Sequence, residues 1–521
     1  MSIARASVAS LARQGASASV EPDFAAFARL YEEGAAQVVW TRLVADLETP
    51  VSAMLKLAHD RPNSFLLESV EGGATRGRYS IIGCEPDVIW RANGNEAELN
   101  RAPQSGAQGF AASPLPTLDS LRALLAESAI TLPPELPPMA AGIFGYMGYD
   151  TVRLIERLPT EKRDPLALPH SILVRPTLIA IFDSVKDEMT IVTPVRPAPG
   201  ISAKSAYARA SDRLNLAIER LDQPLPHESE GDVAAPHPEA KAATSPEAYM
   251  ANVVRAKEYI AAGDIFQVVL SQRFEAPFTL PPFALYRALR RVNPSPFLYY
   301  LNFGDFAVVG SSPEILVRVR DDKVTIRPIA GTRPRGTTPE EDKALAKELL
   351  NDTKERAEHL MLLDLGRNDV GRVAEVGSVR VTDSFFLEYY SQVMHIVSNV
   401  EGKLAADHDA VDALMAGFPA GTVSGAPKVR AMEIIDELED EARGIYAGCV
   451  GYFSADGNMD SCIVLRTSVV KDGVMYVQAG AGVVADSVPE REQAECVSKA
   501  RALFKAADEA VRFASRAKRG Q

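Results

Sequence analysis

Residues 461–482, SCIVLRTSVVKDGVMYVQAGAG, place two β-rich runs close together with room for only a turn between them. Short runs of the same character occur at residues 64–69, 78–83 and 173–182. Such spacings are typical of hairpins, whereas a parallel sheet needs a long crossover, usually a helix, between its strands. The sequence therefore predicts an α+β fold in which antiparallel sheets are flanked by helices.

The chain divides at residues 223–245, QPLPHESEGDVAAPHPEAKAATS, which are rich in Pro, Ala and acidic residues and show no periodicity. We expect a linker there, between an N-terminal domain at 21–222 and a C-terminal domain at 246–521. A helix at 246–262, capped by Ser245, should open the second domain. The strands expected to follow it are 267–274, 306–310 and 323–328.

The composition limits the possible partners. A net charge of −13 over 521 residues repels nucleic acid and anionic membranes, so we expect neither as a partner. An anionic ligand would need a local cluster of Arg, Lys, backbone N–H groups or metal. No long apolar run, secretory signal or C-x-x-C pair is present, which predicts a cytoplasmic protein. Residues 1–20 are expected to form a frayed tail, although an organelle transit peptide would share their composition.

Two E-x-x-E steps lie in strongly helical segments, Glu355/Glu358 in KERAEHLMLLDL and Glu492/Glu495 in PEREQAECVSKARALF. Residues three apart share a helix face, so each step presents two carboxylates side by side. Two such helices facing each other would form an oxygen-rich site for Mg²⁺. Solvated glutamates, or an ion pair between Glu495 and Lys499, explain the same pattern.

Three glycine-rich stretches follow β-rich runs. They are PIAGTR (328–333), FPAGTVSGAPK (418–428) and QAGAG (478–482). The second fails the Walker A pattern because no hydroxyl residue follows Lys428, so we reject nucleotide binding. A glycine turn that leads into a helix can bind a carboxylate through backbone N–H groups, or it can be an ordinary tight turn. Gly480 and Gly482, after the run 474–478, permit either close chain packing or close approach of a ligand.

Three charged or titratable residues stand in otherwise apolar segments: Glu314 in GSSPEILVRV, His395 in SQVMHIVSNV and Arg466 in SCIVLRTSVV. A buried charge needs a partner, which can be an internal ion pair or a ligand. A lone histidine such as His395 is more often a hydrogen-bonded core residue than a catalyst. The chain contains no G-x-S-x-G or H-E-x-x-H motif, so hydrolysis by these routes has no support.

Nine stretches, in this order, resemble those of the chorismate-utilising enzymes and, within that family, the large subunits of anthranilate synthases. They are GDIFQVVLSQRF (263–274), NPSPFLYY (293–300), GSSPEILV (310–317), PIAGTRPRG (328–336), ERAEHLMLLDLGRNDVGRV (355–373), MHIVSNVEG (394–402), FPAGTVSGAPKVRAMEII (418–435), YAGCVGYFSADGNMDSCIVLRT (446–467) and QAGAGVVADSVPERE (478–492). The resemblance extends from about residue 51 to 507. It implies two large antiparallel sheets packed together with flanking helices.

The resemblance also implies chorismate, a dianion, as the substrate and Mg²⁺ as the cofactor. It assigns Glu358 and Glu495 as Mg²⁺ ligands, with Glu355 and Glu492 completing the acidic shell directly or through water. Lys499 would meet the ring carboxylate of the substrate. The other implied substrate contacts are Gly331, Thr332, Tyr446, Arg466, Gly480, Ala481 and Gly482.

By the same resemblance, Glu314 is the general acid that protonates the departing C4 hydroxyl. We expect burial and acidic neighbours to raise its pKa. Ammonia then adds at C2, and His395 is implicated when the C2 proton and pyruvate leave to give anthranilate. Gln267 stands where water-using relatives carry a lysine base, and Ala330 where many aminodeoxychorismate synthases carry a lysine. Both differences favour the ammonia-using, anthranilate-forming reaction that begins tryptophan biosynthesis.

No glutaminase nucleophile is recognisable, so the resemblance implies a separate glutaminase subunit in a hetero-oligomer, expected to be a heterotetramer. Residues 66–69, LLES, resemble the family's tryptophan-sensing motif, although a half-buried strand end would have the same pattern. Tryptophan would bind between Ser69 and Pro296, Phe297 and Leu298, where many relatives have Pro-Tyr-Met. Two other functions stay open, namely an aminodeoxychorismate synthase, which makes a different product, and a non-catalytic tryptophan-binding homologue.

Overall fold

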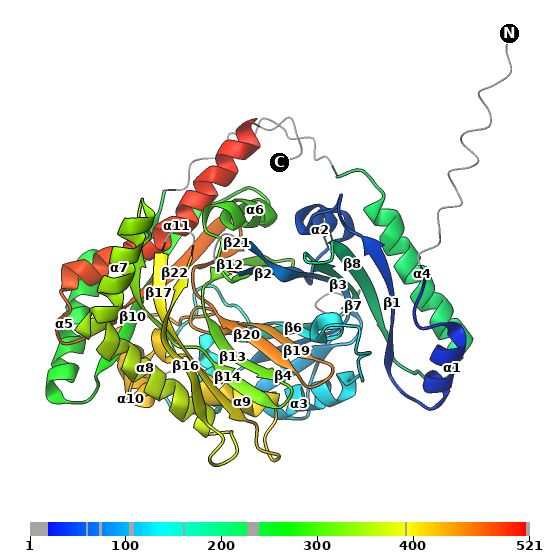
Figure 1. Ribbon diagram of the computed structural model, residues 1–521, viewed down its shortest axis with the longest axis horizontal. Helices are drawn as coiled ribbons and strands as arrows, with labels where there is room; N and C mark the ends of the chain where they lie inside the picture. The colour runs from blue at the N-terminus through cyan, green and yellow to red at the C-terminus, as the bar shows by residue number, and fades with distance from the viewer. Residues whose placement is uncertain are drawn as a thin grey trace, which may run out of the picture.

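The computed structural model describes residues 19–58, 61–71, 75–103, 109–159, 162–226, 239–390 and 393–516. Most of the expected tail, and residues 227–238 of the expected linker, lie outside these ranges. Figure 1 shows the N-terminal half, blue to teal, beside the C-terminal half, green to red. Within the described ranges, no helix combines the length and the apolar character that a membrane crossing needs.

One sheet passes from the C-terminal half into the N-terminal half. Its strands, in spatial order, are β9 (Lys241–Ala242), β10 (Gln267–Pro277), β22 (Val474–Val483), β21 (Thr467–Lys471), β12 (Phe306–Ser312), β11 (Phe297–Asn302), β2 (Ser64–Glu71), β3 (Thr75–Asn93), β7 (Ser171–Asp183), β8 (Glu188–Val195) and β1 (Gln37–Val44). The short strand β18 (Gly425–Ala426) also pairs with β10.

A second sheet starts from the other end of β7. Its strands, in spatial order, are β6 (Gly142–Met147), β19 (Cys449–Ser454), β20 (Met459–Ile463), β13 (Ile315–Arg320), β14 (Lys323–Ile326) and β17 (Val393–Lys403), with β15 (Ile329–Pro334) and β16 (Arg380–Tyr389) also paired to β17. The hairpin partners β4 (Glu96–Asn100) and β5 (Phe110–Ala112) extend β3.

The two sheets pack face to face and are joined by long strands. β7 pairs with β6 through residues 171–174 and with β8 through residues 179–183, so it belongs to both sheets. Between the sheets, the ring of Phe65 on β2 stacks on that of Phe144 on β6, with the ring centroids 4.6 Å apart. Every strand pairing in the described part of the chain is antiparallel, so the predicted α+β class is confirmed.

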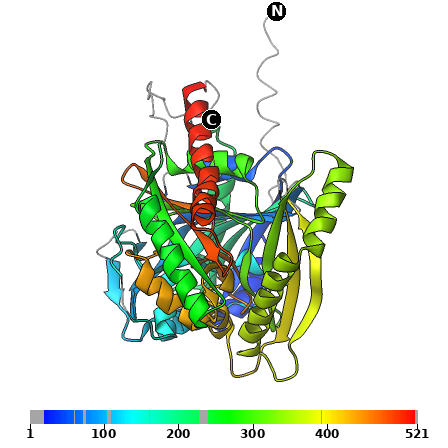
Figure 2. The ribbon, with the colours of Figure 1, turned by 90° about the vertical axis from the view of Figure 1, so that its left-hand side faces the viewer.

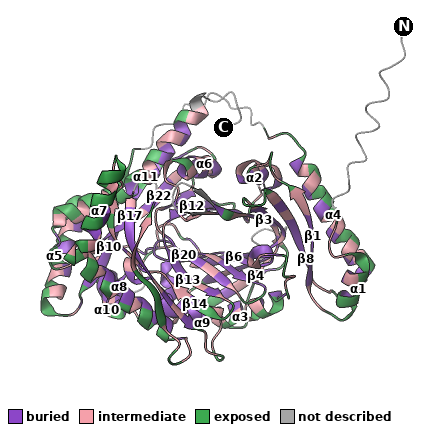
Figure 3. Cartoon of the chain, in the orientation of Figure 1, coloured by how far each residue is buried: buried purple, intermediate pink, exposed green. Residues whose placement is uncertain are grey.

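Helices cover the outer faces of this sandwich. On the first sheet lie α1 (Phe24–Glu32), α2 (Pro50–Ala58), α4 (Ala203–Leu221), α5 (Pro246–Ala262), α6 (Pro282–Val292) and α11 (Pro489–Arg516). Beside the second lie α3 (Thr117–Ser128), α7 (Pro339–Asn351), α8 (Thr353–Gly371) and α9 (Ala410–Gly417), while α10 (Lys428–Leu438) contributes to both cores. Figures 2 and 3 show these helices on the outside, with buried residues concentrated in the strands.

Several local predictions can be compared with these elements. The helix expected at 246–262 is α5, and the Ser245 hydroxyl accepts a hydrogen bond from the Ala248 N–H, as an N-cap does. The strands expected at 267–274 and 306–310 are β10 and β12. The β-rich run at 474–478 does not end before its glycines, because β22 continues to Val483 by pairing with β10.

In the described part of the chain, strand pairing crosses the expected linker twice. β11 of the C-terminal half pairs with β2, and β19 pairs with β6. The division into two domains stays a prediction, but the two halves share both sheets.

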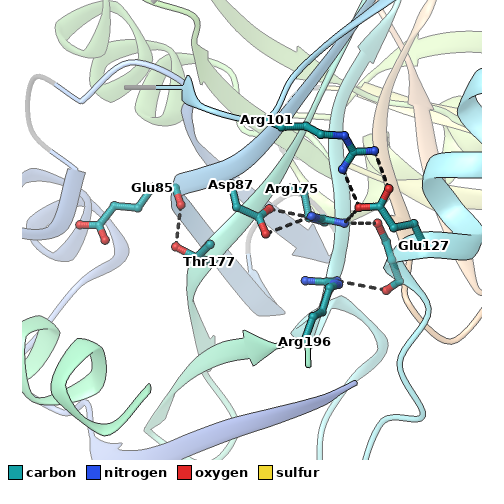
Figure 4. Close-up of polar contacts among 8 residues, drawn as sticks. Glu85, Asp87, Arg101, Glu127, Arg175, Thr177 and Arg196 are labelled. Carbon is teal, nitrogen blue, oxygen red and sulfur yellow. Dashed lines mark hydrogen bonds and ion pairs between the residues drawn. The ribbon is translucent and has the colours of Figure 1, made fainter. Parts of the chain in front are cut away.

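A cluster of ion pairs fixes α3 on the N-terminal part of the sheet (Figure 4). The Arg175 guanidinium on β7 donates to Asp87 at 2.7 and 3.0 Å and to Glu127 of α3 at 2.9 Å. Arg101 also pairs with Glu127, and these guanidinium groups lower the pKa of Glu127 to about 2. Arg196 donates to the backbone carbonyl of Ser128 at 3.2 Å. These contacts orient α3 and lie away from the residues that the sequence singled out.

Candidate active site

The catalytic, substrate and metal residues that the resemblance implies lie where both sheets end in the C-terminal half. Gln267 lies on β10, and Gly480–Gly482 lie on β22 of the first sheet. Gly331 and Thr332 on β15, with His395 on β17, belong to the second sheet. Helices α8 and α11 bring the two glutamate pairs to this end.

Glu314 and Arg466 lie where the chain crosses from one sheet to the other. Glu314 connects β12 of the first sheet to β13 of the second, and Arg466 connects β20 back to β21. At these crossings neither residue belongs to a strand, so side-chain direction is not fixed by pleating. Arg466 has the left-handed φ of 47°, which residues other than glycine adopt infrequently.

Glu358 faces both β10 and α11. Its Oε1 accepts a hydrogen bond from Gln267 Nε2 at 3.1 Å, and the Oε1 atom of Gln267 is buried without a partner among the described residues. Burial is the main reason why the pKa of Glu358 is raised, and the charges of Glu355 and Glu495 raise it further. The carboxylates of α8 and α11 therefore repel one another across a shared space.

The other two glutamates are placed differently. Glu355 forms an ion pair with Arg333 at 3.0 Å, and Arg333 also contacts Asp352 at 2.8 Å. The pKa of Glu492 is raised, chiefly by burial. Both carboxylates thus lie beside the pair Glu358 and Glu495.

Lys499 connects α11 to β22. Its ammonium group lies 2.8 Å from Glu495 and donates to the carbonyl of Gly480 at 2.8 Å. The ion pair that the sequence allowed does form, and it holds the ammonium beside the glycine strand.

These carboxylates fit a magnesium ion that takes part of its coordination from elsewhere. Among the described residues, no three His, Cys, Asp or Glu side chains are close enough to hold a metal by themselves. Mg²⁺ commonly uses only one or two carboxylates and completes its octahedron with water and substrate oxygens. Glu358 and Glu495 could supply those two, and a bound cation would relieve the repulsion between their charges.

Glu314 is buried and keeps its proton near neutral pH. Its two carboxyl oxygens accept from the Thr422 hydroxyl at 3.1 and 3.2 Å. Burial raises the pKa of Glu314 to about 8, while Thr422, the Ile329 N–H and Arg466 act in the opposite direction. The expected direction is thus correct, but acidic neighbours are not among the principal causes: the nearest polar groups favour the ionised form.

His395 has one defined tautomer. Its Nδ1 lies 3.0 Å from the carbonyl oxygen of Gly331 and 3.1 Å from Thr332 Oγ1. A carbonyl only accepts, so Nδ1 carries the hydrogen and Nε2 has the lone pair. Burial lowers the pKa of His395, which keeps the ring neutral. Gly331 can present its carbonyl because it has a φ of 68°, at a register shift between β15 and β17.

Arg466 is a cationic group at this site that no described side chain engages. Its guanidinium is largely buried and forms no hydrogen bond or ion pair with a described residue. Burial lowers its pKa, although the arginine remains charged. An anionic ligand would provide the missing partner.

Close packing accounts for two of the glycines. A Cβ atom on Gly480 would lie 2.8 Å from the Tyr446 hydroxyl, and one on Gly482 would lie 2.6 Å from Gln267 Nε2. The Ala481 side chain lies in the hydrophobic core, so only its backbone can contact a substrate.

The residues expected to sense tryptophan lie on or beside two neighbouring strands of the first sheet. Ser69 on β2 lies opposite Phe297 on β11, and Glu68 lies opposite Leu298. Pro296 immediately precedes β11. The segment 66–69 lies within β2 rather than at its end, because the strand continues to Glu71.

Two polar residues near the site escaped the sequence analysis. Thr422 lies in the glycine-rich stretch 418–428, but no spacing pairs its hydroxyl with Glu314, 108 positions away. Arg443, discussed below, follows α10 in an acidic segment that resembles an ordinary surface loop.

The chain resembles known proteins over most of its length. The sequence profile of the chorismate binding enzymes matches residues 63–505, and the chain belongs to this family. Within it, the chain is 57% identical over 497 residues to anthranilate synthase component 1 of Cereibacter sphaeroides, covering 95% of this chain and 99% of the relative. The corresponding protein of Thermus thermophilus is 51% identical over 474 residues, 89% of this chain and 96% of the relative.

Solved structures show the same fold. Anthranilate synthase component I from Streptococcus pneumoniae superimposes with a TM-score of 0.72 at 39% identity, covering 82% of this chain and 92% of that one. The menaquinone-specific isochorismate synthase of Escherichia coli has a TM-score of 0.67 at 19% identity, covering 93% and 99%, and shares the fold.

Proposed function

We propose that this chain is the large subunit of an anthranilate synthase, which converts chorismate and ammonia into anthranilate, pyruvate and water. Two relatives support this reaction, since the chain matches the anthranilate synthase component 1 proteins of Cereibacter sphaeroides and Thermus thermophilus over nearly their whole length. The observation that carries the proposal is the pair at the sheet crossings: a buried, protonated Glu314 close to Arg466, whose guanidinium has no hydrogen-bond or ion-pair partner among the described residues.

The side chains divide the reaction between them. Arg466 binds a carboxylate of the dianion. Lys499 meets the ring carboxylate, and the backbone at residues 480–482 contacts the substrate. Glu314 gives its proton to the C4 hydroxyl as that group departs and ammonia adds at C2. His395 then takes the C2 proton on Nε2 while Nδ1 donates to Gly331, and pyruvate leaves as the ring becomes aromatic.

Gln267 and Ala330 favour ammonia over water or a covalent lysine adduct. Neither an amide nor a methyl group can act as a base at neutral pH or attack the ring. Ala330 is buried on β15, opposite Ile396.

Members of this family generally require Mg²⁺. Glu358 and Glu495 would hold the ion, with Glu355 and Glu492 beside them. When bound, Mg²⁺ supplies positive charge that offsets a substrate carboxylate without proton transfer.

The metal assignment can be tested with Glu495→Ala. We expect the variant to lose Mg²⁺-dependent turnover while its thermal unfolding midpoint stays near that of the parent, because Glu495 is half exposed. A Mg²⁺ titration of turnover that matches the parent would exclude Glu495 as a ligand. Glu490→Ala, in the first turn of the same helix, is the matched control.

The reaction itself is tested with the purified chain, chorismate, Mg²⁺ and an ammonium salt at mildly alkaline pH. We expect anthranilate fluorescence, and a decrease of at least about 100-fold in Glu314→Gln, the range that general acids contribute. Accumulation of 4-amino-4-deoxychorismate instead would show an aminodeoxychorismate synthase. Tryptophan binding without turnover, and no difference between the parent and Glu314→Gln, would leave the non-catalytic homologue.

We also propose that a separate glutaminase subunit supplies the ammonia, in a cytoplasmic hetero-oligomer that we expect to be a heterotetramer. The isolated chain should then use ammonium but not glutamine. Glutamine-dependent turnover should appear when a bacterial anthranilate synthase glutaminase subunit is added, and light scattering of the mixture gives the stoichiometry. Turnover of glutamine by this chain alone would contradict the proposal.

Tryptophan is proposed as the feedback inhibitor at Ser69, Pro296, Phe297 and Leu298. This proposal is supported by the register that places Ser69 opposite Phe297, although Phe297 lacks the phenol hydroxyl of many relatives. We expect Ser69→Ala to raise the half-inhibitory tryptophan concentration at least about tenfold, with the KM for chorismate unchanged. Ser64→Ala, at the other end of β2, should behave as the parent. Equal inhibition of both variants would place the inhibitor elsewhere.

A further inference from the structure

Arg443 has an almost completely buried guanidinium near the candidate site, with a side chain 1% exposed. It lies between the end of α10 and the start of β19. Its Nε and Nη2 donate to Glu439 at 2.9 and 2.6 Å, so the two charges form a desolvated pair. A buried pair of this kind is weak evidence for stability, because desolvation offsets much of its Coulombic attraction.

The remaining donors of Arg443 reach two backbone carbonyls from different parts of the site. Nη1 donates to Val423 at 2.7 Å, in the 3₁₀ turn Gly421–Val423 that also carries Thr422. Nη2 donates to Val269 at 2.6 Å, two residues after Gln267 on β10. One guanidinium thus connects the turn that contacts Glu314 to the strand that contacts Glu358.

Glu439 extends the same network towards β22, the strand that carries Gly480 and Gly482. Its Oε1 accepts from the N–H and the hydroxyl of Ser271 at 2.7 and 3.0 Å. Ser271 lies opposite Gly480 in the pairing of β10 with β22. The ring of Tyr446, which lies over Gly480, is 5.6 Å from the Arg443 guanidinium carbon.

We propose that Arg443, held by Glu439, is a positioning residue that fixes the Thr422 turn, and with it the hydrogen bond to Glu314, against the Gln267 strand. The inference rests on the proposed function, because it concerns the acid of that reaction. It depends on the planar fork of arginine, because Arg443 donates four hydrogen bonds to three partners. The ammonium group of a lysine is too compact to reach all three.

The consequence is measurable through Glu314. Among the described residues, the groups that face this carboxyl are the Thr422 hydroxyl, the Ile329 N–H and Arg466. Tyr390, the residue after β16, also interacts with its charge. Donation from Thr422 favours the ionised form, so loss of that bond raises the pKa of Glu314. Loosening the turn should therefore move the alkaline limb of the kcat/KM profile to higher pH.

The experiment compares Arg443→Lys, Thr422→Val and the double variant in the ammonia-dependent assay from pH 6 to 10. We expect each single variant to move the alkaline limb upward by about half to one pH unit, and the double variant to move it no further than Thr422→Val does. Arg153→Lys is the matched control, since Arg153 pairs with Asp150 and with Asp436 of α10 at 2.8 and 2.9 Å. It should leave the limb unchanged.

Three outcomes would overturn the proposal. They are an unchanged limb in Arg443→Lys, a shift that adds fully to that of Thr422→Val, and an equal shift in Arg153→Lys. If Arg443→Lys does not fold, Arg443→Met combined with Glu439→Leu removes both charges at similar volume and should show the same upward shift. An inactive parent chain would instead contradict the proposed function and is recognised before any variant is compared.

Discussion

At the scale of single residues, the molecule uses burial to keep an acid protonated. Glu314 loses its hydration at the crossing between two sheets, and this loss outweighs the neighbouring Thr422 hydroxyl and Arg466. Arg466 is also largely buried, and its guanidinium has no hydrogen-bond or ion-pair partner among the described residues. One crossing thus holds a proton donor, and the other holds a cation that no described side chain pairs with.

The shifted pKa of Glu314 also makes a prediction about stability. An unfolded glutamate titrates near pH 4.5, and the folded one near pH 8. Between these values the unfolded state releases a proton that the folded state retains, so stability decreases as pH rises and is constant above about 8. We expect the free energy of unfolding of the parent to decrease by on the order of a few kcal/mol relative to that of Glu314→Gln across this pH window.

Thermal unfolding of both proteins at pH 5, 6.5 and 8 checks this expectation. The two midpoints should be similar at pH 5, and that of the parent should fall below that of Glu314→Gln by pH 8. A difference that is independent of pH would mean that Glu314 ionises normally in the folded protein. The comparison cancels the titration of all other groups, which the two proteins share.

The sequence could identify some of these residues and not others, for a physical reason. A charge in an apolar run, as at Glu314 or Arg466, conflicts with its neighbours and is visible locally. Thr422 and Arg443 fit their local segments well, since hydroxyl groups suit turns and arginines suit surfaces. Their roles depend on contacts more than a hundred positions away along the chain, which no local pattern contains.

At the scale of elements, α8 begins at a position fixed by side chains. Asp352 caps the helix by accepting from the N–H groups of Lys354 and Glu355 at 2.9 and 3.1 Å. Arg333 on β15 holds Asp352 and Glu355 together. The first turn of α8, which precedes Glu358, is thereby tied to the strand that carries Thr332.

Removing this cap should affect the proposed metal site. We expect Asp352→Ala to lower the unfolding free energy by about 1 kcal/mol, the usual cost of losing an N-cap, and to raise the Mg²⁺ concentration needed for half-maximal turnover. Asp352→Asn preserves the cap and should retain most of the stability. Equal Mg²⁺ requirements in the parent and Asp352→Ala would show that the start of α8 does not orient Glu358.

Element type was predictable here, while pairing between strands distant in the sequence was not. Periodicity and the Ser245 cap indicate α5, and hydrophobic runs indicate β10 and β12. β22 continues through Gly480 and Gly482 because β10 pairs with it, although glycines weaken a strand by themselves. Local preference gives way to tertiary pairing at the strand that borders the site.

At the scale of the whole molecule, the halves of the chain complete each other's sheets. β11 is paired on one side by β12 and on the other by β2, so removal of the N-terminal half would expose one edge of β11. The same holds for β19, which lies between β20 and β6. Unpaired edges with buried side chains on both faces are prone to aggregate.

A chain restricted to residues 246–521 therefore tests how far the expected domains are independent. We expect this fragment to aggregate or to elute in the void volume in size-exclusion chromatography, although it contains Glu314, Glu358, His395 and Glu495. Co-expression with residues 1–245 should restore a soluble, active complex, because the β2–β11 and β6–β19 pairings need no covalent connection. A monomeric, active fragment would show instead that the C-terminal half closes its own sheets. The candidate site would then be a property of one domain, and the N-terminal half would serve chiefly to bind the proposed inhibitor.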